Sequence, residues 1–234
     1  MIDMRILVIN PNSSQRMTAD IAATAKAAAP ASVEVDVVCM PESPEVLESF
    51  ADYTLAAAQM MGFVADSGAA GYDGVLVACF GDPGLYAMKE LLDIPCIGIA
   101  EASLSRALLL GSRFSIIAAS TKARSMMESL VDTYGLQARN AGTLTLNAPI
   151  ESFLGNPQKL AALISNVLDA AESASDVLIC GCAGMTALTA TELERERGLA
   201  VIDPVACGVS TLASLINDGA HTSRAGLYAK AAGN

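Results

Sequence analysis

Short apolar runs alternate with longer amphipathic stretches along the whole chain. The runs are rich in Val, Ile and Leu, which is typical of strands buried on both faces of a parallel sheet. The stretches between them repeat apolar residues at the spacing of a helix. The pattern therefore predicts an α/β protein. The expected strands are 5–9, 33–38, 74–78, 96–99, 114–118, 137–145, 177–180 and 200–202, and the expected helices are 16–29, 50–68, 84–92, 102–110, 122–134, 156–174, 186–197 and 205–218.

The second half of this pattern repeats the first. Residues 5–9 align with 113–117 at a shift of 108 positions, and the segment around Cys79 aligns with that around Cys182 at a shift of 103. The same shift of 103 aligns residues 97–99, in the fourth predicted strand, with residues 200–202, the eighth. Three matches in the same order indicate a duplicated α/β unit.

We expect two similar Rossmann-like halves with parallel sheets, related by a pseudo-twofold axis. The first half would comprise residues 1–110 with a C-terminal segment of about 206–234, and the second would comprise residues 111–205. No Gly/Ser-rich linker separates them, so the halves should pack together. Ligands of such sheets bind at the carboxyl ends of the strands, which puts the active site in the cleft between the halves.

Composition and charge narrow the classes of partner. The formal net charge of −11 argues against nucleic acid, which requires a basic surface. No apolar run approaches the length of a membrane helix, so we expect a cytoplasmic protein without a membrane partner. The six cysteines should then be free thiols. Their spacing fits no structural zinc site and no nucleotide-binding glycine motif occurs, so we expect neither a metal nor a cofactor.

Two cysteines occupy matching positions at the ends of predicted strands. Cys79 lies in Val-Leu-Val-Ala-Cys-Phe-Gly, and Cys182 lies in Leu-Ile-Cys-Gly-Cys-Ala-Gly. Backbone N–H groups at the start of the helix that follows Cys79 stabilise a thiolate, so we expect the pKa of Cys79 to fall from about 8.5 toward neutrality. Either cysteine alone would fit a buried structural residue. A repeated pair instead favours one acid/base group on each face of a shared cleft.

Polar residues follow the first strand of each half. Asn10, Asn12 and Ser13 open a helix, and their amide and N–H groups suit a carbonyl, carboxylate or imide oxygen, although such residues are also common helix caps. The counterpart at 118–121 offers backbone N–H groups and the hydroxyl of Ser120 but fewer side-chain donors.

A carboxylate follows the last strand of each half. Glu101 comes after the fourth predicted strand, and Asp203 occupies nearly the same place in the second half. Each carboxylate could tune the nearby thiol or cap the helix that follows, and the sequence leaves both roles open.

Five segments of the chain resemble the aspartate/glutamate/hydantoin racemase superfamily. They are 9–13, 78–85, 97–102, 181–185 and 201–205, within a resemblance that spans roughly residues 4–225. The run Ala-Cys-Phe-Gly-Asp-Pro-Gly-Leu that begins at Ala78 is typical of hydantoin and allantoin racemases. Two places differ from that branch. The chain has Ala118-Ala119 where hydantoin racemases often carry Thr-Thr, and 47–52 departs from the expected lining of the substituent pocket.

The resemblance implies a cofactor-independent racemase of 5-substituted hydantoins or allantoin, assembled as a homo-oligomer. Cys79 and Cys182 would be the two bases, one removing the proton at ring carbon C5 and the other returning a proton from the opposite face. Backbone groups would supply most contacts to the substrate ring. The expected substrate-binding residues are Asn10, Asn12, Ser13, Phe50, Phe80, Gly81, Ala118, Ser120, Ala183 and Gly184.

Other functions stay open on the same residues. A racemase of an open-chain acidic amino acid would use the same two cysteines. A cis–trans isomerase of the maleate type would add one thiol to a double bond. A decarboxylase would need one thiol, and a non-catalytic binding protein would need none. Retention of both cysteines in register favours the racemase.

Overall fold

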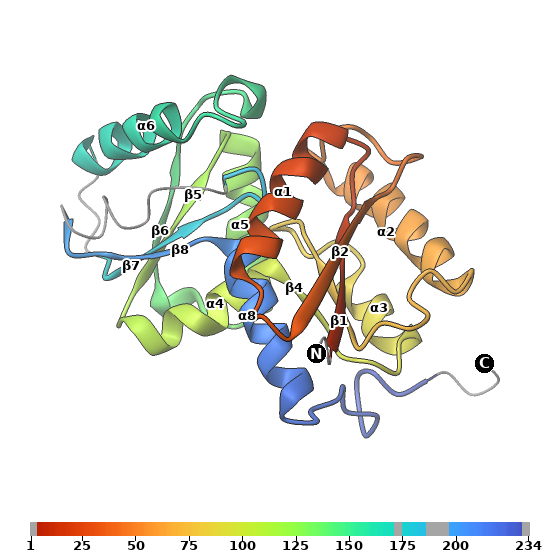
Figure 1. The fold of residues 1–234 in the computed structure, drawn as a ribbon. Helices are drawn as coiled ribbons and strands as arrows, with labels where there is room; N and C mark the ends of the chain where they lie inside the picture. The colour runs from red at the N-terminus through yellow and green to blue at the C-terminus, as the bar shows by residue number, and fades with distance from the viewer. Residues whose placement is uncertain (1–3, 171–174, 186–196, 231–234) are drawn as a thin grey trace.

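The computed structural model describes residues 4–170, 175–185 and 197–230, which form two lobes, each built on a four-stranded parallel sheet (Figure 1). The first sheet has the order β2-β1-β3-β4, and the second has the equivalent order β6-β5-β7-β8. The strands are β1 (Met4–Asn10), β2 (Val33–Cys39), β3 (Gly74–Val77), β4 (Cys96–Gly98), β5 (Phe114–Ala118), β6 (Asn140–Thr145), β7 (Val177–Cys180) and β8 (Ala200–Ile202). The predicted α/β class and the paired parallel sheets are confirmed.

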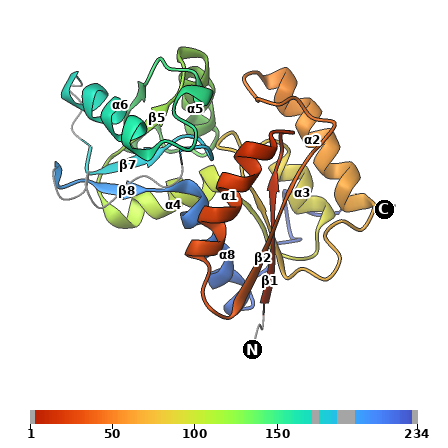
Figure 2. The same ribbon diagram turned by 45° about the horizontal axis from the view of Figure 1, so that its top comes forward.

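Helices flank both sheets. They are α1 (Gln15–Ala28), α2 (Phe50–Ala65), α3 (Leu85–Leu91), α4 (Ile99–Leu110), α5 (Thr121–Thr133), α6 (Pro157–Ala170) and α8 (Pro204–Asn217), with two 3₁₀ turns, η1 (Gln137–Arg139) and η2 (Ile150–Ser152). Two views place α2 and α3 on one side of α1 and the second lobe, with α5 and α6, on the other (Figure 1, Figure 2).

The central strands explain the apolar runs of the sequence. Every residue of β3, β5 and β7 is buried, because helices cover both faces of each sheet. The edge strand β2 is only partly buried, and its sequence mixes Val with Glu and Asp. Continuous apolar runs therefore mark the strands that carry the site at their ends.

One expected strand is shorter in the structure, and one expected helix lies almost wholly outside the described residues. The predicted strand 137–145 begins only at Asn140, so the first part of that prediction is wrong. Residues 137–139 form η1, from which the Arg139 guanidinium reaches back to the carbonyl groups of Gly111 and Ser112. The predicted helix 186–197 lies outside the described residues except for its last position.

The strand pairing tests the internal repeat. Ile9 pairs with Val77 in the first sheet, and Ile117 pairs with Cys180 in the second, which reproduces the shifts of 108 and 103 read from the sequence. The first and third strands of the two halves are therefore equivalent.

For the last strand of each half, the strand pairing gives an alignment shift that differs by two residues from the one read from the sequence. Leu76 pairs with Ile97, and its equivalent Ile179 pairs with Ile202, so the shift for this strand is 105 rather than the expected 103. A slip of two residues keeps every side chain on the same face of the sheet. The apolar pattern alone therefore could not detect the error.

Two helices cross between the lobes. α4 follows the first sheet but also packs on β7 and β8, whereas α8 follows the second sheet but packs on α1 and on β3. The two helices also pack against each other. Gly208 of α8 lies directly on Leu76 of β3, where a Cβ atom would collide with the leucine methyl groups. This exchange joins the two lobes through one continuous hydrophobic core.

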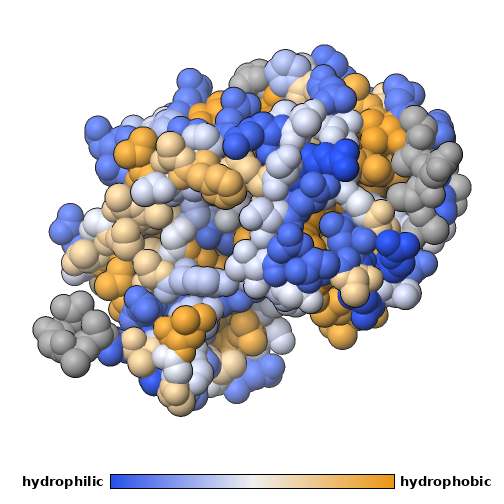
Figure 3. Space-filling model, turned by 180° about the vertical axis from the view of Figure 1, so that it is seen from behind, coloured by the Kyte–Doolittle hydropathy of each residue, from blue (hydrophilic) through white to orange (hydrophobic). Residues whose placement is uncertain are grey.

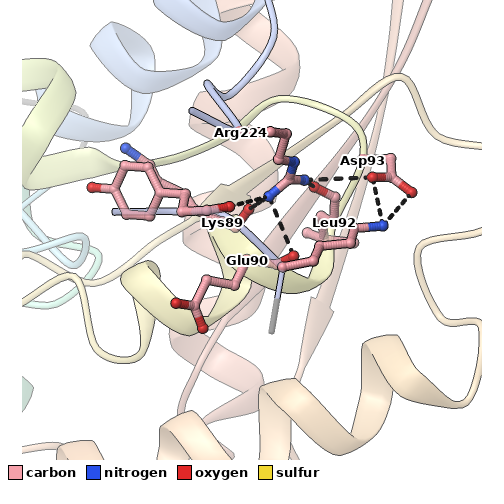
Figure 4. A network of polar contacts seen from close by, with 7 residues as sticks. Lys89, Glu90, Leu92, Asp93 and Arg224 are labelled. Carbon is pink, nitrogen blue, oxygen red and sulfur yellow. Dashed lines mark hydrogen bonds and ion pairs between the residues drawn. The ribbon is translucent and has the colours of Figure 1, made fainter. Parts of the chain in front are cut away.

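The C-terminal tail is tied to the end of α3 (Figure 4). The Arg224 guanidinium donates to the carbonyl groups of Lys89 at 2.7 Å, Glu90 at 3.3 Å and Leu92, and it pairs with Asp93 at 3.5 Å. The last carbonyl groups of a helix have no partner within it, so this arginine caps α3 from a distant part of the chain.

The surface is mixed in character. Seen from behind, hydrophobic residues form separate areas between hydrophilic ones (Figure 3). No helix among the described residues has the length and apolar content needed to cross a bilayer.

Candidate active site

A cavity of about 70 Å³ lies where the carboxyl ends of the two sheets face each other. Cys79 follows β3 and Cys182 follows β7, the equivalent strand, and both thiols line this cavity. The other lining residues are Asn12, Met17, Val46, Leu47, Tyr53, Ala78, Phe80, Ala119, Ala123, Met127, Ile150, Gly181 and Ala183. The structure thus brings together the two cysteines that the sequence repeat singled out.

Two donor groups lie beside the sulfur of Cys79 and lower its pKa. One is the backbone N–H of Gly81, and the other is the hydroxyl of Tyr53, which reaches the sulfur from α2. The backbone N–H of Asp82 also closes a tight turn onto the Cys79 carbonyl at 3.0 Å. The thiol therefore sits in a short loop whose backbone points at the sulfur.

Cys182 sits in the same kind of loop. The Gly184 N–H donates to its sulfur at 3.4 Å, and the Met185 N–H also interacts with it. The Met185 N–H closes the turn onto the Cys182 carbonyl at 3.0 Å. The loop geometry around the two thiols is therefore repeated together with the sheets.

The predicted depression of the Cys79 pKa is wrong. Burial raises the pKa of Cys79 to about 12, and the Gly81 N–H and the Tyr53 hydroxyl lower it less than burial raises it. Burial likewise raises the pKa of Cys182 against the effect of two backbone N–H groups. The helix expected to stabilise the Cys79 thiolate, α3, spans only seven residues, and its first residue is six positions beyond the thiol.

The charges of the two thiols are coupled. A thiolate at Cys182 raises the pKa of Cys79, so the sulfurs are close enough to repel each other when both are ionised. Loss of one proton from the pair therefore makes loss of the second less favourable, which keeps the pair as one thiolate and one thiol.

Asp82 caps a helix that lies far from it in sequence. Its carboxylate accepts hydrogen bonds from the N–H groups of Ala100 at 3.1 Å and Glu101 at 2.8 Å, at the start of α4. It also accepts a hydrogen bond of 2.8 Å from the Tyr134 hydroxyl in the second lobe. Burial raises the pKa of Asp82 to about 7 despite these three donors.

The corrected register explains why α4 needs a remote cap. With the shift of 105, Gly98 corresponds to Asp203. Asp203 caps α8 itself, accepting from the N–H groups of Val205 at 2.9 Å and Ala206 at 3.0 Å. Gly98 has no side chain, and a Cβ atom there would collide with the Asp82 carboxylate. In the first half the carboxylate that caps the helix therefore comes from Asp82 in the thiol loop, and not from the residue that directly precedes the helix.

Among the described contacts, the Glu101 side chain neither caps α4 nor bonds to Cys79. Its side chain pairs with Lys89 at 2.5 Å, on the far side of the Asp82 loop. Of the two roles left open for Glu101 and Asp203, capping therefore holds for Asp203 alone.

The two asparagines at and just after the end of β1 have different roles: Asn10 supports the loop, and Asn12 lines the cavity. The amide nitrogen of Asn10 is buried and donates to Asn12 Oδ1 at 2.7 Å and to Thr18 at 2.9 Å. Asn12 lines the cavity, and its oxygen also accepts from the Ser14 N–H at 2.9 Å. Ser13 is held by its backbone N–H, which donates to Pro44, rather than lining the cavity.

Three other expected binding residues lie beside the cavity lining. Ala118 is fully buried at the end of β5, and the lining residue is its neighbour Ala119. The Ser120 hydroxyl caps α5 by accepting from Ala123. Phe50 is 56% exposed and packs edge-to-face on Tyr53, with ring centroids 6.1 Å apart.

Tyr53 is the residue that the sequence did not identify. It lies inside α2, in an amphipathic stretch where no motif distinguishes it. Its ring rests on the backbone of Gly81, where a Cβ atom would collide with the hydroxyl end of the ring. The glycine two residues after Cys79 therefore leaves room for the tyrosine.

Two backbone donors are open to a ligand. Phe80 and Ala183 follow the two thiols, line the cavity and are each 3% exposed. Within the described part of the chain, their N–H groups donate to no protein acceptor. Hydrogen-bond donors without a protein partner are what a developing oxyanion requires.

The sequence matches the Asp/Glu/hydantoin racemase family over residues 6–212. The chain belongs to this family. It is 34% identical over 227 residues to a hydantoin racemase of Pseudomonas sp. strain NS671, covering 96% of this chain and 91% of that relative. Membership in the family and this relative support a racemase function.

Solved structures agree with the assignment. An allantoin racemase from Klebsiella pneumoniae superposes with a TM-score of 0.90 and 34% identity, covering 99% of this chain and 95% of that chain. A maleate cis–trans isomerase from Nocardia farcinica reaches a TM-score of 0.67 at 18% identity, covering 91% of this chain and 92% of that chain. At that identity the second likeness shows a shared fold alone.

Proposed function

We propose that the protein is a cofactor-independent racemase of 5-substituted hydantoins or of allantoin, with Cys79 and Cys182 as its two bases. The observation that carries this proposal is that both thiols line one cavity from equivalent positions in the two lobes. Relatives that racemise hydantoins and allantoin support the choice of substrate class.

The reaction moves one proton in and one proton out. The thiolate of one cysteine takes the hydrogen from ring carbon C5, which leaves a thiol and a carbanion delocalised onto the C4 carbonyl. The thiol of the other cysteine then protonates C5 from the opposite face and becomes the thiolate. The reverse reaction begins from that second state, so the enzyme needs one thiolate and one thiol in both directions.

The coupling between the thiols suits this cycle. Because ionisation at Cys182 raises the pKa of Cys79, loss of the first proton makes loss of the second more difficult. The raised pKa values also make each thiolate a stronger base than an ordinary cysteine. A strong base is appropriate for a carbon acid.

The cavity contains donors for the substrate oxygens. The N–H groups of Phe80 and Ala183 come from opposite lobes, so each can donate to a different carbonyl oxygen of the ring. Within the described residues, the Asn12 amide nitrogen bonds only to the sulfur of Met17, at 3.2 Å, and can turn to a ligand oxygen. Donors aimed at the C4 oxygen would stabilise the enolate as charge develops there.

The lining also discriminates between substrate classes. No Lys, Arg or His lines the cavity among the described residues, whereas an acidic amino acid or maleate carries two carboxylates. Burying two carboxylates without cationic partners is costly. The walls therefore favour a neutral cyclic ureide over the open-chain substrates of the alternative functions.

The size of the cavity favours a compact ring substituent. A volume of about 70 Å³ is small beside the roughly 300 Å³ or more of a typical ligand pocket, so a ring with a bulky substituent would crowd it. Met17, Leu47 and Met127 form flexible apolar walls that a larger substituent would have to displace.

The decisive assay follows the circular dichroism of single enantiomers of 5-methylhydantoin, allantoin and 5-benzylhydantoin. The solution contains reductant, and an enzyme-free blank gives the spontaneous rate. We expect decay well above the blank for at least one of the first two compounds and slower decay for the benzyl compound. Blank-level decay for all three would overturn the proposed function.

A further inference from the structure

The Tyr53 side chain extends from α2 to the loop that carries Cys79. It lines the cavity together with Cys79 and Cys182, and the hydroxyl end of its ring lies so close to the thiol loop that Gly81 can carry no Cβ atom. The Phe50 ring packs on it edge-to-face, at an interplanar angle of 87°. These contacts hold the hydroxyl end of Tyr53 beside the loop that carries Cys79.

The hydroxyl remains a donor throughout the working range of pH. Burial and the neighbouring Cys79 and Cys182 raise the pKa of Tyr53 above its usual 10, so the phenol stays protonated. A neutral phenol beside a sulfur donates its hydrogen when that sulfur is a thiolate.

Each sulfur thus has two donors, but of different kinds. Cys182 receives two backbone N–H groups, those of Gly184 and Met185. Cys79 receives one backbone N–H, that of Gly81, and the Tyr53 hydroxyl. The residue equivalent to Met185 in the first half is Asp82, whose charge raises the pKa of Cys79.

We propose that Tyr53 is a positioning residue that holds the Cys79 sulfur and stabilises its thiolate, offsetting the negative charge of Asp82. Burial and the charges of Cys182 and Asp82 already raise the pKa of Cys79, and loss of this donor would raise it further and shift the thiolate toward Cys182. The proposal rests on the proposed function, since it concerns how evenly the two bases share one negative charge.

The test is the rate at which iodoacetamide alkylates each cysteine, measured by peptide mass spectrometry from pH 7 to 10. Only the thiolate reacts, so the rate at fixed pH reports the ionised fraction. We expect Tyr53→Phe to slow alkylation of Cys79 about three- to tenfold, since a hydrogen bond to a charged sulfur is lost while basicity partly compensates. The rate at Cys182 should change by less than about twofold.

The matched control is Tyr72→Phe, which removes a tyrosine hydroxyl bonded to Asp36 in the same lobe. It should leave both rates unchanged. An unchanged Cys79 rate in Tyr53→Phe, or equal slowing at both cysteines, would overturn the proposal. Because alkylation requires no substrate, this result is independent of whether any ureide is racemised.

Discussion

The two thiol loops share a backbone but differ in their chemistry. Each loop follows the third strand of its half and directs a glycine N–H at the sulfur. The first loop continues with Asp82, which is buried and joined to the other lobe through Tyr134, whereas the second continues with the apolar Met185. The comparison indicates that the duplicated scaffold fixes where the thiols lie and buries both of them, and that neighbouring side chains modify the pKa of each thiol differently.

The largest expected effect comes from removing one thiol at a time. Cys79→Ser and Cys182→Ser should each lower racemisation by about 10²- to 10⁴-fold, the usual contribution of a general acid or base. In deuterated water each variant should still exchange the C5 hydrogen of one enantiomer, and the two variants should act on opposite enantiomers. Exchange of the same enantiomer by both variants would contradict the assignment of one thiol to each face.

The pH dependence of the wild-type enzyme comes next. Because burial raises the pKa of both thiols, the reactive thiolate is scarce at neutral pH and increases with pH. The value of kcat/KM should rise from pH 7 to pH 10 by about tenfold per unit at first, in proportion to the thiolate. A flat profile above pH 7, after subtraction of the spontaneous rate, would show that the thiols ionise near neutrality.

Equivalent glycines should respond differently to the same substitution. A Cβ atom on Gly81 would collide with the Tyr53 ring, whereas the nearest atom to one on Gly184 is a methyl carbon of Leu154 at 3.2 Å. Gly81→Ala should cost about 1–3 kcal/mol of unfolding free energy by overpacking, and Gly184→Ala should cost less. Chemical denaturation measures both, and the reverse order would refute the packing described for the first loop.

The charge of Asp82 should make the stability of the protein depend on pH. Its pKa is about 7 in the folded protein against 3.8 for a free side chain, so the folded state binds its proton more tightly between those values. The unfolding free energy of the wild type should therefore fall relative to that of Asp82→Asn as pH rises from about 4 to 7.

Removing the same charge should also lower the pKa of Cys79. Alkylation of Cys79 at pH 8 should be about threefold faster in Asp82→Asn, which corresponds to half a pKa unit. The matched control is Asp203→Asn, which keeps a side-chain cap on α8 and should leave the Cys79 rate unchanged. Equal rates in wild type and Asp82→Asn would show that the carboxylate does not act on the thiol.

Much of the fold could be predicted because buried parallel strands leave continuous apolar runs. The strands 114–118, 177–180 and 200–202 occur with the predicted bounds, and the repeated cysteines mark equivalent loops. The division of the chain near residues 110 and 206 stays a prediction, as do the catalytic roles and the homo-oligomer.

The remaining features depend on contacts between distant segments. Asp82 precedes α3 in sequence, so a local rule assigns it to that helix, yet its carboxylate caps α4. Tyr53 reaches the thiol from a helix that carries no motif, and only the packing against Gly81 identifies it. The direction of the thiol pKa shifts depends on burial, which the residues around Cys79 do not encode.

The measurement that tests the central claim most directly is deuterium incorporation during the first turnovers of one enantiomer in deuterated water. Two bases on opposite faces predict that the newly formed enantiomer carries deuterium at C5 while the unreacted enantiomer retains hydrogen. Deuterium appearing in the unreacted enantiomer as fast as in the product would indicate a single base that both removes and returns the proton. That result would contradict the two-thiol account.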